Sequence, residues 1–165
     1  MKAVANSSVL IALSTIGQLP LLPQRFAEGL LIPVAVWQEV VETGEGRPGS
    51  VQVASASWVA VRHVQDQSLV SMLRMELDAG EAEAIALARE EQADAILLDE
   101  KDARRVARGL GLAVLGTLGI LIWAKQAGLI RSLGEQLDIL QTQGQFRLSR
   151  SVCQEALHAV GEGKP

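Results

Sequence analysis

Short apolar runs alternate along the chain with longer stretches in which apolar and polar residues recur at helical spacing. Runs of strand length, rich in Val, Ile and Leu, predict β-strands, and the longer periodic stretches predict amphipathic helices. The predicted strands are Lys2–Ala5, Leu30–Ile32, Trp58–Val64, Ala95–Leu98 and Ala113–Leu115. Trp58–Val64 alternates large apolar residues with small or polar ones, which indicates a strand at the edge of the sheet.

Helix start and stop signals place the predicted helices between and after these strands. The helices are Val9–Ile16, Pro33 to about Glu42, Met72–Glu91 with a break near Asp78-Ala79-Gly80, Glu100–Arg108, Thr117 to about Gln126, Arg131–Thr142 and Ser149–Val160. A first-turn proline favours the helix that starts at Pro33. Three Gly and one Pro within Thr43–Ser50 indicate a loop.

Strands that alternate with helices imply parallel pairing through right-handed crossovers. The fold class that we predict is therefore α/β, a three-layer α/β/α sandwich around a central parallel sheet. We expect a single domain over residues 1–165, with the helices from about residue 131 packed on the same domain. In open parallel sheets ligands bind at the carboxyl ends of the strands, where the strand order reverses. Three segments follow strand ends directly: Asn6-Ser7-Ser8, Asp99-Glu100 and Gly116-Thr117.

Composition narrows the class of protein. Because the chain has three Trp, two Phe and no Tyr, its core must be mainly aliphatic. A single cysteine, Cys153, cannot form an intrachain disulfide, so nothing indicates an oxidising compartment. The longest apolar run, Leu110–Ala124, is shorter than the roughly 20 residues of a membrane span and contains three glycines. We expect a cytoplasmic protein that does not cross a membrane.

Charge is unevenly distributed along the chain. The net charge of −4 argues against a uniformly basic surface for nucleic acid. Nine acidic residues and one basic residue lie within Glu76–Glu100, whereas six basic residues and one acidic residue lie within Lys101–Arg131. An acidic segment followed by a basic one suits a cation site beside an anionic ligand. The solvated faces of two amphipathic helices would explain the same pattern equally well.

Two acidic residues stand out by position, and each has a structural explanation as well as a functional one. Asp99 ends a strand and could face a metal ion, but it could also cap the next helix together with Asp102. Glu81 shares a helical face with the apolar residues 85 and 88, which is costly for a carboxylate unless a cation or donor meets it. Asp78 and Glu81 also have the spacing of a capping box. Glu83 is expected to be solvated, and periodicity does not distinguish Glu39 from Glu42.

Five segments, in order and over nearly the whole chain, resemble the motifs of the PIN-domain family. They are Val4-Ala5-Asn6-Ser7-Ser8-Val9-Leu10-Ile11, Ile32-Pro33-Val34-Ala35-Val36-Trp37-Gln38-Glu39-Val40, Gly80-Glu81-Ala82-Glu83-Ala84-Ile85-Ala86-Leu87-Ala88, Leu97-Leu98-Asp99-Glu100-Lys101-Asp102-Ala103-Arg104 and Gly116-Thr117-Leu118-Gly119-Ile120-Leu121. The sequence is most similar to a poorly characterised prokaryotic branch, which is related to the ribonuclease toxins of type II toxin–antitoxin pairs.

The resemblance implies a site in which carboxylates hold one or two Mg²⁺ or Mn²⁺ ions and hydrolyse RNA. Hard divalent cations prefer such oxygen ligands, and a bound ion activates water and stabilises charge on the phosphate. Carried over residue by residue, Glu39, Glu81 and Asp99 would bind the metal or orient its water, with Asn6 at the first position. Ser8, Glu100 and Thr117 would support them, and Arg104, Arg105 and Arg108 would steer the RNA backbone. A solvated helix face explains these arginines equally well.

Asn6 departs from the family pattern, which has Asp at this position. An amide oxygen can bind a cation but carries no charge, so metal binding should be weaker. A natural loss of activity, a tolerated variant and a deliberate inactivation all remain open. The first hypothesis is a ribonuclease that forms a homodimer and is restrained by a small antitoxin protein. The alternative is a catalytically impaired PIN-like module that binds RNA or protein.

Overall fold

The predicted parallel sheet is present in the computed structural model, which describes residues 1–144 and 146–163. Its five strands are β1 (Ala3–Ala5), β2 (Leu30–Pro33), β3 (Val59–Arg62), β4 (Ala95–Leu97) and β5 (Val114–Leu115). They lie in the order β3-β2-β1-β4-β5 with every pairing parallel. The α/β sandwich expected from the sequence is thus confirmed, and the third strand along the chain lies at an edge as predicted.

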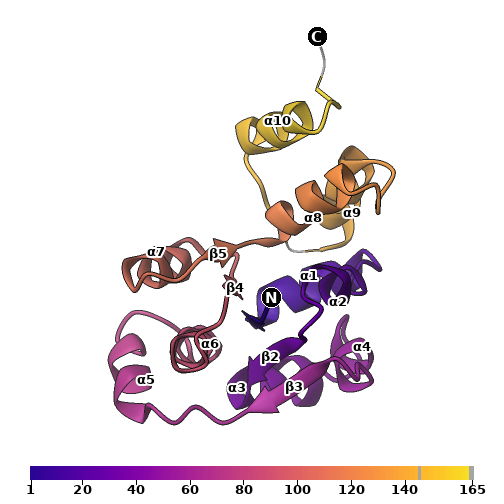
Figure 1. The fold of residues 1–165 in the computed structure, drawn as a ribbon. Coiled ribbons are helices and arrows are strands. Elements are labelled where there is room, and N and C mark those ends of the chain that lie inside the picture. The colour runs from indigo at the N-terminus through magenta and orange to yellow at the C-terminus, as the bar shows by residue number, and fades with distance from the viewer. Residues whose placement is uncertain (145, 164–165) are drawn as a thin grey trace.

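Helices cover both faces of the sheet (Figure 1). They are α1 (Ser7–Thr15), α2 (Leu21–Arg25), α3 (Val34–Trp37), the π-helical turn η1 (Gln38–Glu42), α4 (Ser50–Ala54), α5 (Gln67–Leu73), α6 (Ala79–Glu90), α7 (Lys101–Gly109), α8 (Thr117–Gln126), α9 (Leu133–Gln143) and α10 (Arg150–Ala159). None of those within the described ranges is both long and apolar enough to cross a bilayer.

Side chains that alternate along the strands supply two separate apolar cores. Ala3, Ala5 and Leu97 face a core that contains residues of α1, α8 and α9. Val4 and Ile96 face a second core, which contains residues of α5, α6 and α7. Because helices cover both faces of the sheet, a ligand can reach the sheet mainly at the ends of its strands.

The strand order reverses between β1 and β4. β1 pairs with β2 on one side and with β4 on the other, in a register that sets Ala5 opposite Leu97. The backbone N–H of Asn6 continues this ladder by donating to the Leu97 carbonyl at 3.1 Å. The residues that follow β1 and β4 are consequently neighbours at the switch point, although more than ninety positions separate them in sequence.

Several boundaries differ from the predicted ones. The short helices α2 and α4 were not predicted, because five residues are too few to show helical periodicity. Pro33 ends β2 instead of opening a helix, and the helix after it changes into the π turn η1. The break near Asp78 is confirmed, but α5 begins at Gln67, where the Asp66 carboxylate caps it by accepting from Leu69 N–H at 3.0 Å.

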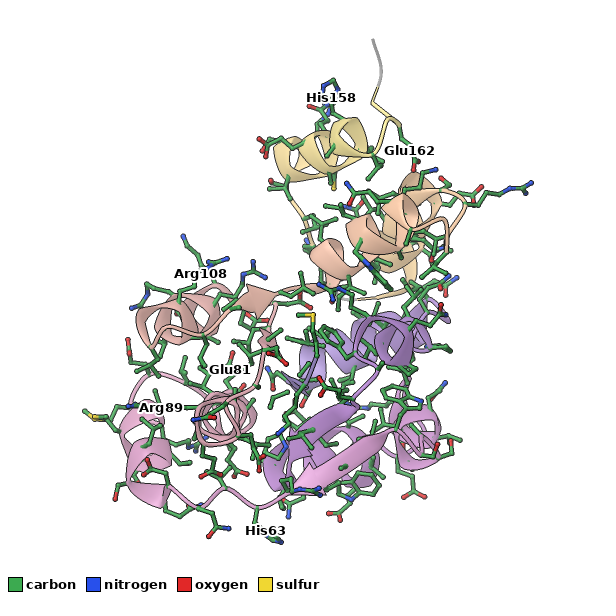
Figure 2. All side chains as sticks on the ribbon, in the orientation of Figure 1. His63, Glu81, Arg89, Arg108, His158 and Glu162 are labelled. Carbon is green, nitrogen blue, oxygen red and sulfur yellow. The ribbon has the colours of Figure 1, made fainter. Side chains whose placement is uncertain are left out.

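Glu162, which follows α10, links this helix to the start of α9 through hydrogen bonds. Its carboxylate accepts hydrogen bonds from the Ser132 hydroxyl and from the N–H groups of Leu133 and Gly134 at the start of α9. Burial opposes the charge, but these hydrogen bonds and Lys125 hold the pKa of Glu162 below its usual value. α10 lies farthest from the sheet, and Glu162 lies just beyond it (Figures 1 and 2).

We predict that β4, the strand that leads to Asp99, contributes strongly to the free energy of unfolding. Leu97 is fully buried in β4, so Leu97→Ala should lower the free energy of unfolding by about 2–5 kcal/mol through lost burial and a cavity. Leu129, which is 41% exposed, provides the matched control, and Leu129→Ala should cost less than about 0.5 kcal/mol. Urea denaturation of both variants measures the difference; equal costs would contradict the packing described.

Candidate functional site

Asn6 occupies the position between β1 and α1. Its backbone is extended, with φ −88° and ψ 166°, as is normal for a helix N-cap. The side chain nevertheless makes no capping hydrogen bond to α1. It is only 5% exposed, and its Oδ1 atom has no hydrogen-bond partner within the described part of the chain. A buried amide oxygen without a donor is costly, so this atom is suited to meeting a ligand.

Glu39 reaches the same edge of the sheet from η1. Its Oε2 atom accepts a hydrogen bond from the hydroxyl of buried Ser7 at 2.9 Å, although the residue as a whole is exposed. This bond leaves Oε1 free of any protein donor among the hydrogen bonds of the described residues. The contact distinguishes Glu39 from Glu42, which periodicity could not do.

Gly80 leaves room for oxygens from three different elements. A β-carbon on Gly80 would lie 3.0 Å from Asn6 Oδ1, 3.3 Å from Glu39 Oε2 and 3.6 Å from Asp78 Oδ1. Any side chain here would therefore crowd the amide and carboxylate oxygens. We call Asn6, Glu39, Asp78 and Gly80 the Gly80 cradle.

Glu81 adjoins the cradle but is committed to a capping box. Its Oε1 accepts from Asp78 N–H at 3.1 Å, while Asp78 Oδ1 accepts from Glu81 N–H at 2.8 Å. Glu81 is 7% exposed and points to the inner side of α6 (Figure 2). Burial raises its pKa above the usual value, and the charges of Asp78 and Glu100 add to this effect. The start of α6 thus concentrates negative charge at the site.

Asp99 caps a helix, although not the one expected. Its Oδ1 accepts from Thr117 N–H at 2.8 Å and its Oδ2 from the Thr117 hydroxyl at 2.7 Å, so it caps α8. The predicted pairing with Asp102 is wrong, because Glu100 is the N-cap residue of α7 and makes no side-chain cap. Burial raises the pKa of Asp99, while Thr117 and the charge of Arg104 oppose the rise.

Arg104 lies against Asp99 through a second glycine. A β-carbon on Gly116 would be 2.5 Å from Arg104 Nη1 and 2.9 Å from Asp99 Oδ1. The same Nη1 donates to the Leu98 carbonyl at 2.9 Å. Burial lowers the pKa of Arg104, and Arg108 lowers it further. Because Gly116 has no side chain, the Arg104 guanidinium fits beside the Asp99 carboxylate, which follows β4.

The three candidate arginines do not form one group. Arg104 is half-buried at the edge of the sheet, whereas Arg105 and Arg108 are exposed. Arg105 pairs with Glu76 at 3.1 Å on the solvent side, and Arg108 lies on the outside of α7 (Figure 2). Only Arg104 is in contact with the candidate site.

Sequence reasoning overlooked several participants. Ser7, and not Ser8, contacts Glu39, and the space that Gly80 and Gly116 leave at the site was not predicted, although both glycines lie in the segments that resemble the family. Glu83 is not simply solvated, since its Oε1 accepts from Ala35 N–H at 3.2 Å and so caps α3. Ser8 lines the neighbouring cavity beside Asp99 and Arg104, and its Oγ also has no hydrogen-bond partner in residues 1–144 and 146–163. The resemblance therefore pointed to this turn, and the contact of Ser7 with Glu39 within it was not predicted.

The donor set fits a hard cation, although it is poor in charge. Amide and carboxylate oxygens are the ligands that Mg²⁺ and Mn²⁺ prefer. The unpartnered Asn6 oxygen and the space left by Gly80 provide both a ligand and room for an ion. Among the residues described, no three His, Cys, Asp or Glu side chains gather as a metal site, so Glu39, Glu81 and Asp99 do not converge as a set of three carboxylate ligands.

Comparison with known proteins supports one family. A family model described as a PIN domain matches residues 2–162, almost the entire chain. No curated protein matches the chain significantly.

The buried charge of Glu81 predicts a pH-dependent stability. Because its folded-state pKa is raised, the folded protein binds the proton more tightly, and stability falls as pH rises from the usual glutamate pKa through the folded value. Glu81→Gln keeps a capping-box residue but removes the charge. We expect the variant to be more stable than the wild type at pH 7 and equal to it at pH 4. Urea denaturation across this range measures the gap; a gap that widens towards acid would contradict the prediction.

Proposed function

The chain belongs to the PIN-domain family, and we propose that it is a metal-dependent ribonuclease that hydrolyses phosphodiester bonds with Mg²⁺ or Mn²⁺. The observation that carries the proposal is the Asn6 oxygen, which is buried without a donor and faces Glu39 across Gly80. A helix cap alone does not explain this oxygen, because it caps nothing. A cation would satisfy it.

Asn6 and Glu39 would hold the ion at the Gly80 cradle, and Glu81 and Asp99 would add negative charge near it. The bound ion would activate water and stabilise negative charge on the phosphate. Ser7 orients Glu39 by donating to Oε2, which directs the other oxygen away from the hydroxyl. Asp99 has both oxygens engaged by Thr117, so it contributes charge and position to the site more than a free lone pair.

Arg104 supplies positive charge on the other side of the site. The Leu98 carbonyl holds its guanidinium beside Asp99 in the space that Gly116 leaves, where an RNA phosphate could form a charge-assisted hydrogen bond. Burial raises the pKa of Glu81, so this carboxylate accepts a proton more readily than an exposed glutamate does. Glu100, Arg105 and Arg108 are exposed and would act through the charge that they add near the site.

A second function is favoured by one feature, the neutral amide at position 6. With a charge missing and no cluster of three ionisable ligands within residues 1–144 and 146–163, the domain would bind metal weakly. It would then act as an RNA- or protein-binding module. The two functions differ in whether the protein as it stands cleaves RNA when Mn²⁺ is added.

The partners that we propose follow from the family resemblance. An enzyme of this kind would act as the toxin of a toxin–antitoxin pair, restrained by a small antitoxin protein, and would form a homodimer. Size-exclusion chromatography with light scattering would detect the dimer.

Activity should depend on the residue at position 6, where the family has Asp and this chain has Asn. We expect the wild type to cleave RNA slowly with Mn²⁺ and Asn6→Asp to raise Mn²⁺ affinity by roughly tenfold, because it adds a charged ligand. Glu39→Gln should reduce cleavage by about 100-fold or more. Glu42→Gln, on the same turn but without a contact to Ser7, is the matched control and should leave cleavage unchanged.

Isothermal titration with Mn²⁺ and cleavage of labelled RNA measure these effects. If neither the wild type nor Asn6→Asp binds Mn²⁺ or cleaves RNA, the enzyme assignment fails and the binding module remains. If Glu42→Gln loses as much activity as Glu39→Gln, the assignment of Glu39 fails.

A further inference from the structure

A cavity of about 700 Å³ opens beside Asp99 and Arg104. It lies between α1, the end of β5, α8 and the segment that leads into α10. Its walls are mainly apolar: Ile11, Leu115, Leu118, Ile122, Phe146 and Leu148. We call it the Phe146 cavity. Its volume is within the range of about 300–1,000 Å³ that is usual for small-ligand sites.

The polar atoms of the cavity are few and are concentrated near the sheet. Asp99, Glu100 and Arg104 line it where it meets the candidate site, and Arg147 also lines it. Ser8 also lines it, and its Oγ is buried without a partner in the part of the chain that the structure describes. An occupant thus meets apolar side chains, one free hydroxyl, two guanidinium groups and the two carboxylates next to the candidate site.

We propose that the Phe146 cavity binds one unstacked base of single-stranded RNA, next to the phosphate that is held at Arg104. This inference rests on the proposed function, since RNA is the substrate of the adjoining site. A base offers flat apolar faces that stack on an aromatic ring such as Phe146, and it needs few hydrogen bonds. Arg104 and Arg147 both line the cavity and would contact the phosphates next to that base.

A peptide segment fits the cavity less well. An extended chain carries an N–H and a carbonyl at every residue, and burying them without partners is costly. Asp99 already has both oxygens engaged, and the Thr15 hydroxyl donates to Ile11, so Ser8 is the main free group in the apolar part. Paired bases of a duplex could not enter the cavity at all, which gives the proposal its selectivity for single strands.

RNA binding without metal tests the proposal on the full chain. The probes are fluorescein-labelled octamers of oligo(A) and oligo(U) and an RNA duplex, each titrated by fluorescence anisotropy in EDTA. We expect Phe146→Ala to weaken binding of a single strand by about tenfold, and Phe146→Trp to retain it, because stacking requires an aromatic ring. Duplex binding should change by less than about twofold, since it depends on phosphate contacts alone.

Leu157→Ala is the matched control. Leu157 is half-buried on α10 and lines a different cavity, between α8 and α10, so its truncation should leave single-strand binding unchanged. Circular dichroism checks that each variant is folded. Equal losses in Leu157→Ala and Phe146→Ala would assign the effect to general loosening of the C-terminal helices and overturn the proposal.

Two further results would also overturn it. One is a wild type that binds single strands no more tightly than duplex. The other is unchanged binding in Phe146→Ala, which would favour an apolar peptide as the occupant. Because EDTA removes any metal, failure of Mn²⁺-dependent cleavage does not affect this test. Conversely, Phe146→Ala could keep both its binding of single-stranded RNA and its Mn²⁺-dependent cleavage. That result would contradict the proposal that the cavity binds a base, but it would leave the nuclease function standing.

Discussion

The parallel pairing of β1 with both β2 and β4 is the constraint on which the site depends. It sets Ala5 beside Leu97 and extends through the hydrogen bond from Asn6 N–H to the Leu97 carbonyl. Since parallel strands end at one edge of a sheet, Asn6 and Asp99 emerge together at the point where the strand order reverses. η1 and α6 then bring Glu39 and Glu81 to the same edge of the sheet.

Negative charge at this edge is stabilised only in part by the protein. Burial raises the pKa of both Glu81 and Asp99, so each carboxylate is less favourable there than in water. Thr117 and Arg104 compensate Asp99 from one side. On the other side, the Gly80 cradle offers oxygens and hardly any donors. This excess of oxygens over donors would favour binding of a divalent cation. The neutral Asn6 lowers the negative charge at the site without removing the excess.

Much of the fold was predictable because strand and helix periods differ clearly in this sequence, and the five strands were all expected. The site was predictable only to the level of the turn. Asp99 follows the end of a strand and Glu81 lies in the first turn of a helix, positions that capping explains as readily as chemistry, and both residues do form caps. The contact of Ser7 with Glu39, the roles of Gly80 and Gly116, and the separation of Arg104 from Arg105 depend on long-range packing. Local patterns carry no information about such contacts.

Anomalous diffraction from crystals grown or soaked with Mn²⁺ tests the central claim most directly. The account predicts a single strong anomalous peak beside Gly80, within about 2.5 Å of Asn6 Oδ1 and of a Glu39 carboxylate oxygen. A peak elsewhere, or no peak while the Asn6 amide turns its Nδ2 atom towards Glu39, would contradict it. In that case Asn6 would be a structural residue, and the edge of the sheet would be the remnant of a metal site.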